Sequence, residues 1–199
     1  MITADILKNI CHTMKYERAA VIATLINEKC TIYGIKNIHE FLATIIHESG
    51  EFSIKEESLF YTHPQRICDV WPKRFPSLLS ALPYIHNPEE LANKVYGGRM
   101  GNDKPNDGWL YRGSGFIQLT GKDSFQKYAD YIHKELSLIP ELLRKDDSYA
   151  FDSACWEFVI DKKLNGTVDF KYVTKRINGG FNGWDSRVKY YDRCKKYIG

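Results

Sequence analysis

Glu48 and Glu57, two glutamates nine positions apart, are the residues of this sequence that are best suited, by type and by spacing, to acid–base catalysis. Glu48 follows the apolar run 41–46 and precedes Gly50, so we expect it at the end of a buried helix. Glu57 then arrives on the returning segment. Two carboxyl groups, one protonated and one ionised, are what acid-catalysed cleavage of a glycosidic bond requires. The pair therefore indicates glycosidase chemistry.

The surroundings of the two glutamates predict different roles. Glu48 is the better proton donor, because burial beside apolar residues favours the neutral carboxyl group. Glu57 lies in the polar run 55–58 and is expected to be ionised and to activate water, with Glu56 as a rival for this role. Nine extended residues span roughly 30 Å, so the pair can cooperate only if the chain folds back after Gly50. The carboxyl separation decides the mechanism, at about 6.5–9.5 Å for inversion and about 5–5.5 Å for retention.

Two other chemistries compete for the same residues. His47 and Glu48 begin like the zinc motif His-Glu-x-x-His, but Glu51 stands where the second histidine belongs, so zinc is not expected. A cysteine nucleophile, Cys155 or Cys68 with a distant histidine, would instead hydrolyse peptide bonds. Cys155 lies in an apolar helical run, which favours a packing role. The five cysteines include no Cys-x-x-Cys pair and are interpreted as small buried hydrophobic residues.

Apolar spacing predicts the elements that must position these residues. Asn37, with Glu40 three residues later, predicts a capping box at the start of the Glu48 helix, and Gly50 predicts its end. Four prolines between positions 68 and 91 favour short helices, and the glycine-rich stretch 97–108 is expected to be an exposed loop. Further helices are expected at 5–14, 16–27, 124–136, 148–160 and 171–177. The whole chain, 1–199, is predicted to be one mainly α-helical domain with at most a short β-hairpin.

Composition excludes several classes of protein. The chain of 199 residues is 43% hydrophobic, which is sufficient for a core. A net charge of +3 without a dense basic stripe does not indicate nucleic-acid binding. No signal peptide or membrane-spanning segment is recognisable, so membrane insertion is not expected.

Several separate segments, taken in order, resemble glycoside hydrolase family 19, the chitinase-like enzymes, and within it the phage endolysins. Each segment alone is weak evidence, but the ordered set is specific. The resemblance extends from about Phe41 to Arg187. The segments are His47-Glu48-Ser49-Gly50, Glu57-Ser58-Leu59-Phe60-Tyr61, 71–76, 92–96, 99–102, 107–113, Ile117-Gln118-Leu119-Thr120-Gly121 and 177–183.

The resemblance implies an inverting enzyme with a lysozyme-like, two-lobed helical fold and a central cleft. Glu48 matches the family's general acid, Glu57 its general base, and Thr120 a position that helps to hold the nucleophilic water. The remaining matches, which line the sugar cleft in the family, are Tyr111, Arg112, Gln118 and Asn178. No metal or organic cofactor is implied.

Two departures from the endolysin pattern stand out. Endolysins usually have Glu-Asn-Leu-Asn-Tyr where this chain has Ser58 and Phe60 after Glu57, so two polar contacts near the base are absent or replaced. Ser114 stands where a second arginine is common, which removes one basic contact to substrate.

The resemblance implies peptidoglycan as substrate, cleaved between N-acetylmuramic acid and N-acetylglucosamine. Chitin is the alternative, and a catalytically inert wall-binding module is a further one. No separate wall-binding module is expected, because only two short helices precede position 38. The protein is expected to be a monomer that accumulates in the cytoplasm of a bacterial host and reaches the wall after a holin opens the membrane.

Overall fold

Helix α3 (Ile38–Glu48) carries Glu48 at its last position in the computed structural model, which describes all 199 residues. Its residues 40–46 are all buried. The helix ends at Ser49, whose hydroxyl donates to the Ile45 carbonyl at 2.6 Å. Gly50 follows with a left-handed φ of 54°. The predicted end of this helix is therefore confirmed.

The predicted capping box at the start of α3 is wrong. Asn37 occupies the N-cap position but makes no capping hydrogen bond with its side chain. Its amide instead donates to the Thr167 carbonyl at 2.7 Å and accepts from the Gly166 amide at 2.9 Å. Glu40 accepts from the Tyr191 hydroxyl at 2.9 Å. Both side chains are thus used in long-range contacts that local spacing does not reveal.

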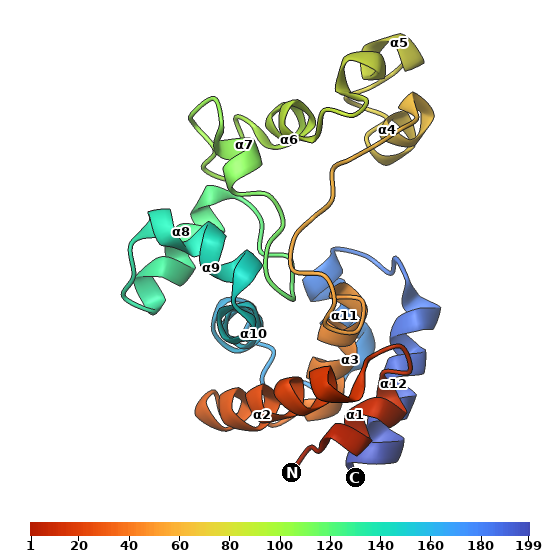
Figure 1. Cartoon of the computed structure of the whole chain (residues 1–199), viewed down its shortest axis with the longest axis vertical. Coiled ribbons are helices and arrows are strands. Elements are labelled where there is room, and N and C mark those ends of the chain that lie inside the picture. Colours follow the sequence, from red (N-terminus) through yellow and green to blue (C-terminus); the bar gives the residue numbers. More distant parts are fainter. The chain divides into compact units, whose positions relative to one another are not determined.

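The chain divides into two compact units. The first comprises residues 1–55, 115–118 and 141–199, and the second comprises 56–114 and 119–140, so the division falls within α9 (Ile139–Lys145). Figure 1 shows the helices in sequence colours. Besides α3, the first unit contains α1 (Ala4–Ile10), α2 (Tyr16–Ile32), α10 (Asp147–Trp156), a π-helical turn (Glu157–Asp161), α11 (Phe170–Asn178) and α12 (Trp184–Ile198).

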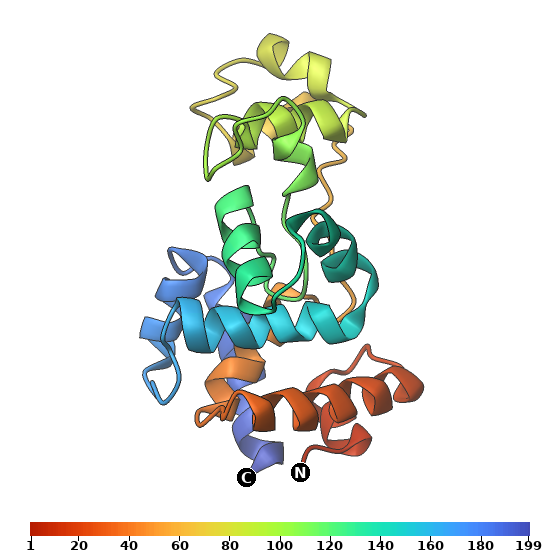
Figure 2. The same cartoon turned by 90° about the vertical axis from the view of Figure 1, so that its left-hand side faces the viewer.

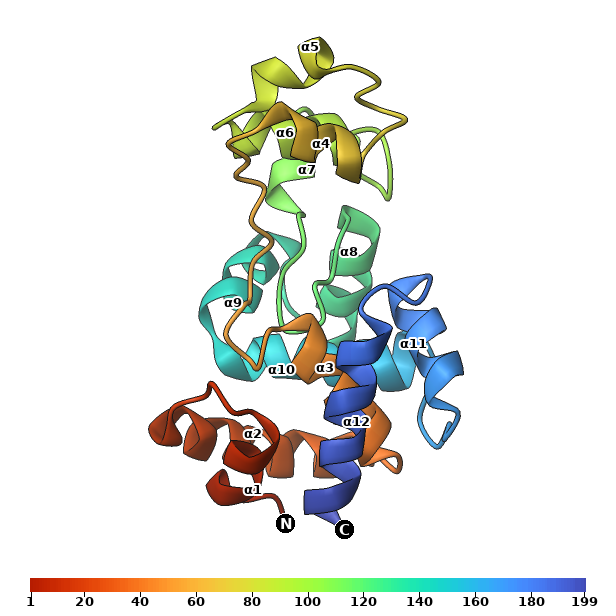
Figure 3. The same cartoon turned by 90° about the vertical axis from the view of Figure 1, so that its right-hand side faces the viewer.

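The first unit has its core around α3, which packs against α12 and α11. Phe41 of α3 lies 5.0 Å from the ring of Phe158 and 5.9 Å from that of Phe151. Helix α1 packs against both α2 and α12, so the two chain termini lie close together in this unit (Figure 3). Burial of this apolar surface fixes the helix that carries Glu48.

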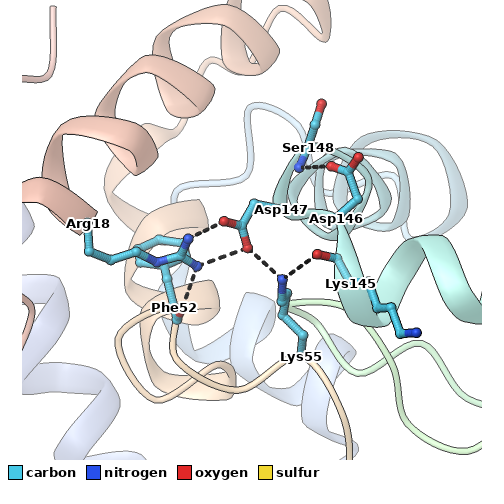
Figure 4. A network of polar contacts seen from close by, with 7 residues as sticks. All are labelled: Arg18, Phe52, Lys55, Lys145, Asp146, Asp147 and Ser148. Carbon is cyan, nitrogen blue, oxygen red and sulfur yellow. Dashed lines mark hydrogen bonds and ion pairs between the residues drawn. The ribbon is translucent and has the colours of Figure 1, made fainter.

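A network around Asp147 ties the first unit together at the point where the chain leaves α3 (Figure 4). Arg18 of α2 donates to both oxygens of Asp147, and to the carbonyl of Phe52 at 2.9 Å. Lys55 donates to Asp147 at 2.8 Å and to the Lys145 carbonyl at 3.1 Å. Burial opposes ionisation of Asp147, but its hydrogen bonds with Arg18 and Lys55 outweigh burial and lower its pKa. Helices α2 and α10 also pack directly against each other (Figure 2). The network joins both helices to the segment after α3.

The second unit consists of short helices around a smaller core. Leu59, Phe75 and Leu91 are among its buried residues, and Trp71 and Tyr84 pack against them. Prolines begin two of its helices, where the missing N–H costs nothing. The elements are α4 (Pro64–Val70), α5 (Leu78–Ala81), a 3-10 turn (Leu82–Tyr84), α6 (Pro88–Tyr96), α7 (Asp107–Leu110), α8 (Lys122–Tyr131) and a second 3-10 turn (Leu136–Leu138).

The mainly helical prediction is confirmed, and β-structure is limited to isolated bridges that pair Ser114 with Glu56 and with Leu119. The expected loop 97–108 is partly wrong, because Asn102 is buried and α7 begins at Asp107. Helices α9 and α12 were not predicted. None of the helices combines the length and apolar character needed to cross a bilayer.

Candidate active site

An ion pair joins the C-terminal end of α3 to α12. We call the region around this pair, Glu48 and Arg187, the Glu48 end. Glu48 Oε1 lies 2.5 Å from Nη2 of Arg187, in the first turn of α12. Arg187 is 1% exposed, whereas the Glu48 side chain retains 20% of its exposure. Arg187 Nε also donates to the Asn182 carbonyl at 3.1 Å. The guanidinium is therefore held by the Asn182 carbonyl and in turn fixes the position of the Glu48 carboxyl group.

His47, the residue before Glu48, closes the same end of α3 against the start of α12. Its Nδ1 lies 3.1 Å from the hydroxyl of Ser186. Burial, and then the charge of Arg187, lower the pKa of His47, which favours the neutral ring. Gly183 has a left-handed φ of 72°, and a Cβ there would lie 2.5 Å from the imidazole. Only glycine allows the loop to approach His47 this closely.

Two non-glycine residues in the left-handed region follow Gly50. Glu51 has φ 58° and Phe52 has φ 61°, a conformation that costs roughly 1–2 kcal/mol per residue. Glu51 accepts hydrogen bonds from the amide and hydroxyl of Thr13 and, at 3.1 Å, from Tyr190. These contacts hold the turn, and through it the direction in which the chain leaves Glu48.

A third carboxyl group, Glu157, is buried in the π-helical turn after α10. Lys162 Nζ lies 3.4 Å from its Oε1. Burial raises the pKa of Glu157 to about 7, Lys162 opposes the rise, and the charges of Asp161 and Glu48 add to it. Glu157 therefore experiences the charge of Glu48 within the first unit.

Glu57 belongs to the second unit and is held by uncharged donors. The hydroxyl of Tyr96 donates to both carboxylate oxygens, at 2.7 and 2.9 Å. The amide of Gly113 donates to Oε2 at 3.2 Å, while the Glu57 amide donates to the Gly113 carbonyl at 2.9 Å. Burial and the neighbouring Glu57 raise the pKa of Tyr96, so its hydroxyl remains a donor throughout the physiological range.

The neighbouring Glu56 is already engaged by a cation. Arg112 Nη2 pairs with its carboxylate, and Nη1 donates to the Trp109 carbonyl at 2.6 Å. The guanidinium also lies over the Trp109 ring, 3.3 Å from its centre. Glu56 therefore has an ionic partner, whereas the hydrogen-bond donors to the Glu57 carboxylate are neutral.

Glu57 opens into a pocket of about 290 Å³ within the second unit. We call it the Glu57 pocket. Carboxylates, a hydroxyl group, two aromatic rings and a proline surround it, a mixture typical of small-molecule sites. It is lined by Glu56, Glu57, Ser58, Leu59, Phe60, Pro88 and Trp109.

A sequence relative identifies the family. A "Glycosyl hydrolase family 19 domain-containing protein" from Haemophilus influenzae is 37% identical over 155 residues, which cover 76% of this chain and 74% of the relative. The chain belongs to glycosyl hydrolase family 19. It is therefore a glycoside hydrolase, and the resemblance found in the sequence motifs is confirmed at the level of the family.

Solved structures agree with this assignment at the level of fold. Chitinase C from Streptomyces griseus HUT6037 matches with a TM-score of 0.57 at 13% identity, covering 98% of this chain and 91% of that one. A mutant of chitinase C matches with a TM-score of 0.55 at the same identity, covering 98% and 75%. No family model matches the sequence.

The other predicted site residues of this family 19 chain are distributed over both units. In the second unit, Tyr111 is 5% exposed and its ring packs edge-on to Phe125 at 5.3 Å, and Thr120 is half-buried. In the first unit, Gln118 has a left-handed φ of 58° and donates to the Gly115 carbonyl at 2.8 Å. Asn178 ends α11, with its amide 3.5 Å from the Asn182 carbonyl. Their contact with sugar stays a prediction.

Two residues beside the carboxyl groups of this family 19 site had not been given a role. Tyr96 fell within a recognised segment and Arg187 at the end of the recognised range, yet only the folded chain shows which carboxylate each one contacts. An arginine in a helix and a tyrosine beside a glycine carry no local signal for such partners.

The rival cysteine chemistry finds no support in the first unit. Cys155 is fully buried, and burial followed by a hydrogen bond with Cys30 raises the pKa of its thiol well above the ordinary value. A thiolate nucleophile needs the opposite environment, exposed and electropositive.

Proposed function

We propose that this family 19 enzyme is an endolysin-type muramidase that hydrolyses, with inversion, the β-1,4 bond between N-acetylmuramic acid and N-acetylglucosamine in peptidoglycan. Glu48 acts as general acid and Glu57 as general base. Thr120 helps to hold the attacking water. Membership of the family and the retention of both carboxylates support this assignment.

Inversion is a single displacement, in which Glu48 gives its proton to the oxygen of the leaving sugar while water attacks the anomeric carbon. The carboxylate that this produces faces the guanidinium of Arg187 at 2.5 Å. Arg187 therefore stabilises Glu48 more after proton transfer than before it. An interaction that strengthens as the reaction proceeds lowers the barrier.

In the same step Glu57 takes a proton from the water, which attacks from the opposite face of the ring. Tyr96 donates to both Glu57 oxygens, at 2.7 and 2.9 Å, so the carboxylate is held in one orientation. General acid and base groups contribute about 10²–10⁴-fold each. Inversion requires a water between base and sugar, which corresponds to a carboxyl separation of about 6.5–9.5 Å.

The proposal depends mainly on one observation: each carboxylate is held by its own fixed donors. Each carboxylate also stands at the position that matches the family's acid or base. The test is loss of turbidity of Gram-negative cells whose outer membrane has been removed. Glu48→Gln should lower the rate at least 100-fold, because the glutamine amide is too weak an acid to protonate the leaving oxygen. Glu17→Gln, on an exposed part of α2 in the same unit, should leave it unchanged. Full activity of Glu48→Gln would end the assignment of the acid.

Chitin hydrolysis is the second candidate, and the fold similarity to chitinase C favours it. Both polymers contain N-acetylglucosamine, so the same pair of carboxyl groups can serve either reaction. Mass analysis of digests separates the two, because muropeptides indicate peptidoglycan and chitooligosaccharides indicate chitin.

The endolysin proposal includes a cellular route. The protein would accumulate as a monomer in the bacterial cytoplasm and reach the wall when a holin opens the membrane. Expression in bacteria should therefore leave cells intact until a membrane-permeabilising agent is added. Lysis without permeabilisation would contradict this route without affecting the enzymatic proposal.

A further inference from the structure

The segment after Glu57 alternates between anchored and open side chains. Leu59 is buried in the core of the second unit, and Tyr61 packs against Trp71 at 5.8 Å. Phe60, between them, is 55% exposed. Leu59 and Tyr61 are thus anchored in the core of the second unit, whereas Phe60 between them is left outside it. A phenylalanine fixed in this way lines the Glu57 pocket.

The ring of Phe60 is held from outside the pocket. The imidazole of His86 lies 5.1 Å from it, ring centre to ring centre, at an angle of 57°. His86 is itself fixed, because its amide donates to the Tyr61 carbonyl at 2.9 Å and its backbone is left-handed with φ 56°. A ring with a fixed neighbour loses little freedom when a ligand binds against it.

The other large aromatic ring of the pocket is less suited to contact a ligand face to face. One face of Trp109 is covered by the Arg112 guanidinium, 3.3 Å from the ring centre. Trp109 is also partly buried against the core of the second unit, so less of its ring is accessible than of the Phe60 ring. Phe60 is thus the exposed aromatic side chain that stands beside the base Glu57 and the hydroxyl of Ser58.

A pyranose ring matches this arrangement chemically. One face of the sugar presents C–H groups that pack on an aromatic ring, and its rim presents hydroxyl groups that donate to carboxylates and hydroxyls. Glu57 and Ser58 supply such acceptors on one side of the Glu57 pocket, and Phe60 supplies the apolar surface on another.

We propose that Phe60 is the stacking platform for an N-acetylated hexosamine ring bound beside Glu57, and that it determines how tightly this enzyme holds that ring. The inference rests on the proposed function. It gives a role to the departure at position 60, where the resembling endolysins usually have asparagine.

The test compares variants of Phe60 on a soluble glycan strand freed of its stem peptides. Phe60→Ala removes the platform, and Phe60→Leu keeps an apolar side chain but removes the flat ring. Both should raise KM about three- to tenfold with kcat within twofold, because a uniform binding contact is lost. Phe60→Tyr should behave like the wild type. The matched control is Leu79→Ala, since Leu79 is 76% exposed in the same unit and lies outside the pocket.

Several results would overturn the platform. An unchanged KM for Phe60→Ala, or a wild-type KM for Phe60→Leu, would exclude stacking. A fall in kcat at constant KM would mean that Phe60 orients Glu57 instead of binding sugar. An effect seen only with peptide-bearing strands would assign Phe60 to the peptide. Thermal unfolding of each variant identifies misfolding. If Phe60→Ala and Phe60→Leu misfold, Phe60→Tyr, which keeps the ring, still tests the ring contact, and a raised KM for this variant would contradict it.

Failure of the platform is distinguishable from failure of the proposed function. If wild-type protein releases no sugar from peptidoglycan or chitin, or if Glu48→Gln is fully active, the proposed function fails. If wild-type protein is active and the Phe60 variants have the same KM as the Leu79→Ala control, the platform fails but the proposed function does not.

Discussion

The Glu48 end and the Glu57 pocket hold the same functional group in opposite ways. Glu48 faces a buried guanidinium, and the turn that follows it is fixed by the carboxylate of Glu51. Glu57 receives a phenol hydroxyl and a backbone amide, neither of which carries a charge. Ionic support depends strongly on burial and on the state of the partner, whereas a hydrogen bond from a neutral donor to a charged group contributes about 1.5–3 kcal/mol.

This difference fits the two roles proposed for the carboxyl groups. An acid alternates between a neutral and a charged form during each turnover, so a nearby cation changes the energy of that step. A base that must orient one water depends more on direction, which two convergent donors supply. Removing the support should therefore have a larger effect at the Glu48 end than in the Glu57 pocket.

The largest effect is expected from Arg187→Met, which keeps the length of the side chain and removes its charge. The rate of wall hydrolysis should fall at least 100-fold, because the carboxylate left after proton transfer loses its cation. Stability should fall by about 2–3 kcal/mol, less than for a fully buried pair because Glu48 is partly exposed. Rates and urea unfolding, measured well below the melting temperature, separate the two effects.

The double variant Glu48→Gln with Arg187→Met is the control for this interpretation. If Arg187 acts through Glu48, the double variant should be no slower than Glu48→Gln alone. Multiplicative losses would show that Arg187 acts on something else, and the contrast between the two regions would then have no basis.

A smaller effect is expected from Tyr96→Phe, which removes only the hydroxyl. The Gly113 amide still contacts Glu57, so kcat should fall about tenfold, and stability should fall by about 1.5 kcal/mol because the lost hydrogen bond is to a charged group. Tyr61→Phe is the matched control, since burial and the charge of Glu57 raise the Tyr61 pKa but no Tyr61 hydroxyl contact with Glu57 is present. A loss from Tyr96→Phe as large as that from Arg187→Met would break the comparison.

The sequence predicted the parts of the fold that are encoded by apolar spacing. Helix α3 was found because Phe41, Leu42, Ile45 and Ile46 repeat at helical intervals over one buried face. Helix α12 was missed because the residues it buries fully are Arg187 and Cys194, in an otherwise polar and tyrosine-rich segment. A helix that uses a charged residue as part of its buried face has no hydrophobic stripe to recognise.

The site was predictable to a similar extent. Family motifs marked Glu48 and Glu57, but their partners are set by tertiary structure. Arg187 is 139 residues from Glu48 in the chain, and Tyr96 is 39 residues from Glu57. Nothing local distinguishes these side chains from exposed ones. Asn37 shows the reverse case, in which a local capping signal gave way to long-range partners.

The smallest effect on activity is expected from Glu51→Gln, which tests whether charge holds the turn after Glu48. Burial opposes ionisation of Glu51, but hydrogen bonds from Thr13 and Tyr190 outweigh it and lower its pKa below the usual 4.5. A carboxyl group with a lowered pKa in the folded state stabilises the fold at pH values above its unfolded-state pKa. That stability is lost as the pH falls through the folded-state pKa. Wild type should therefore exceed Glu51→Gln by about 1–2 kcal/mol at pH 7.

The difference between wild type and Glu51→Gln should shrink as the pH drops below about 4.5, because a protonated glutamate resembles glutamine. Urea unfolding between pH 3 and 8 measures it. Thr13→Val, which removes one donor, should reproduce part of the loss at pH 7 and converge with wild type over the same range. Parallel curves at all pH values would mean that the Glu51 carboxylate charge does not hold this turn. The Glu48 end would then differ from the Glu57 pocket only in Arg187.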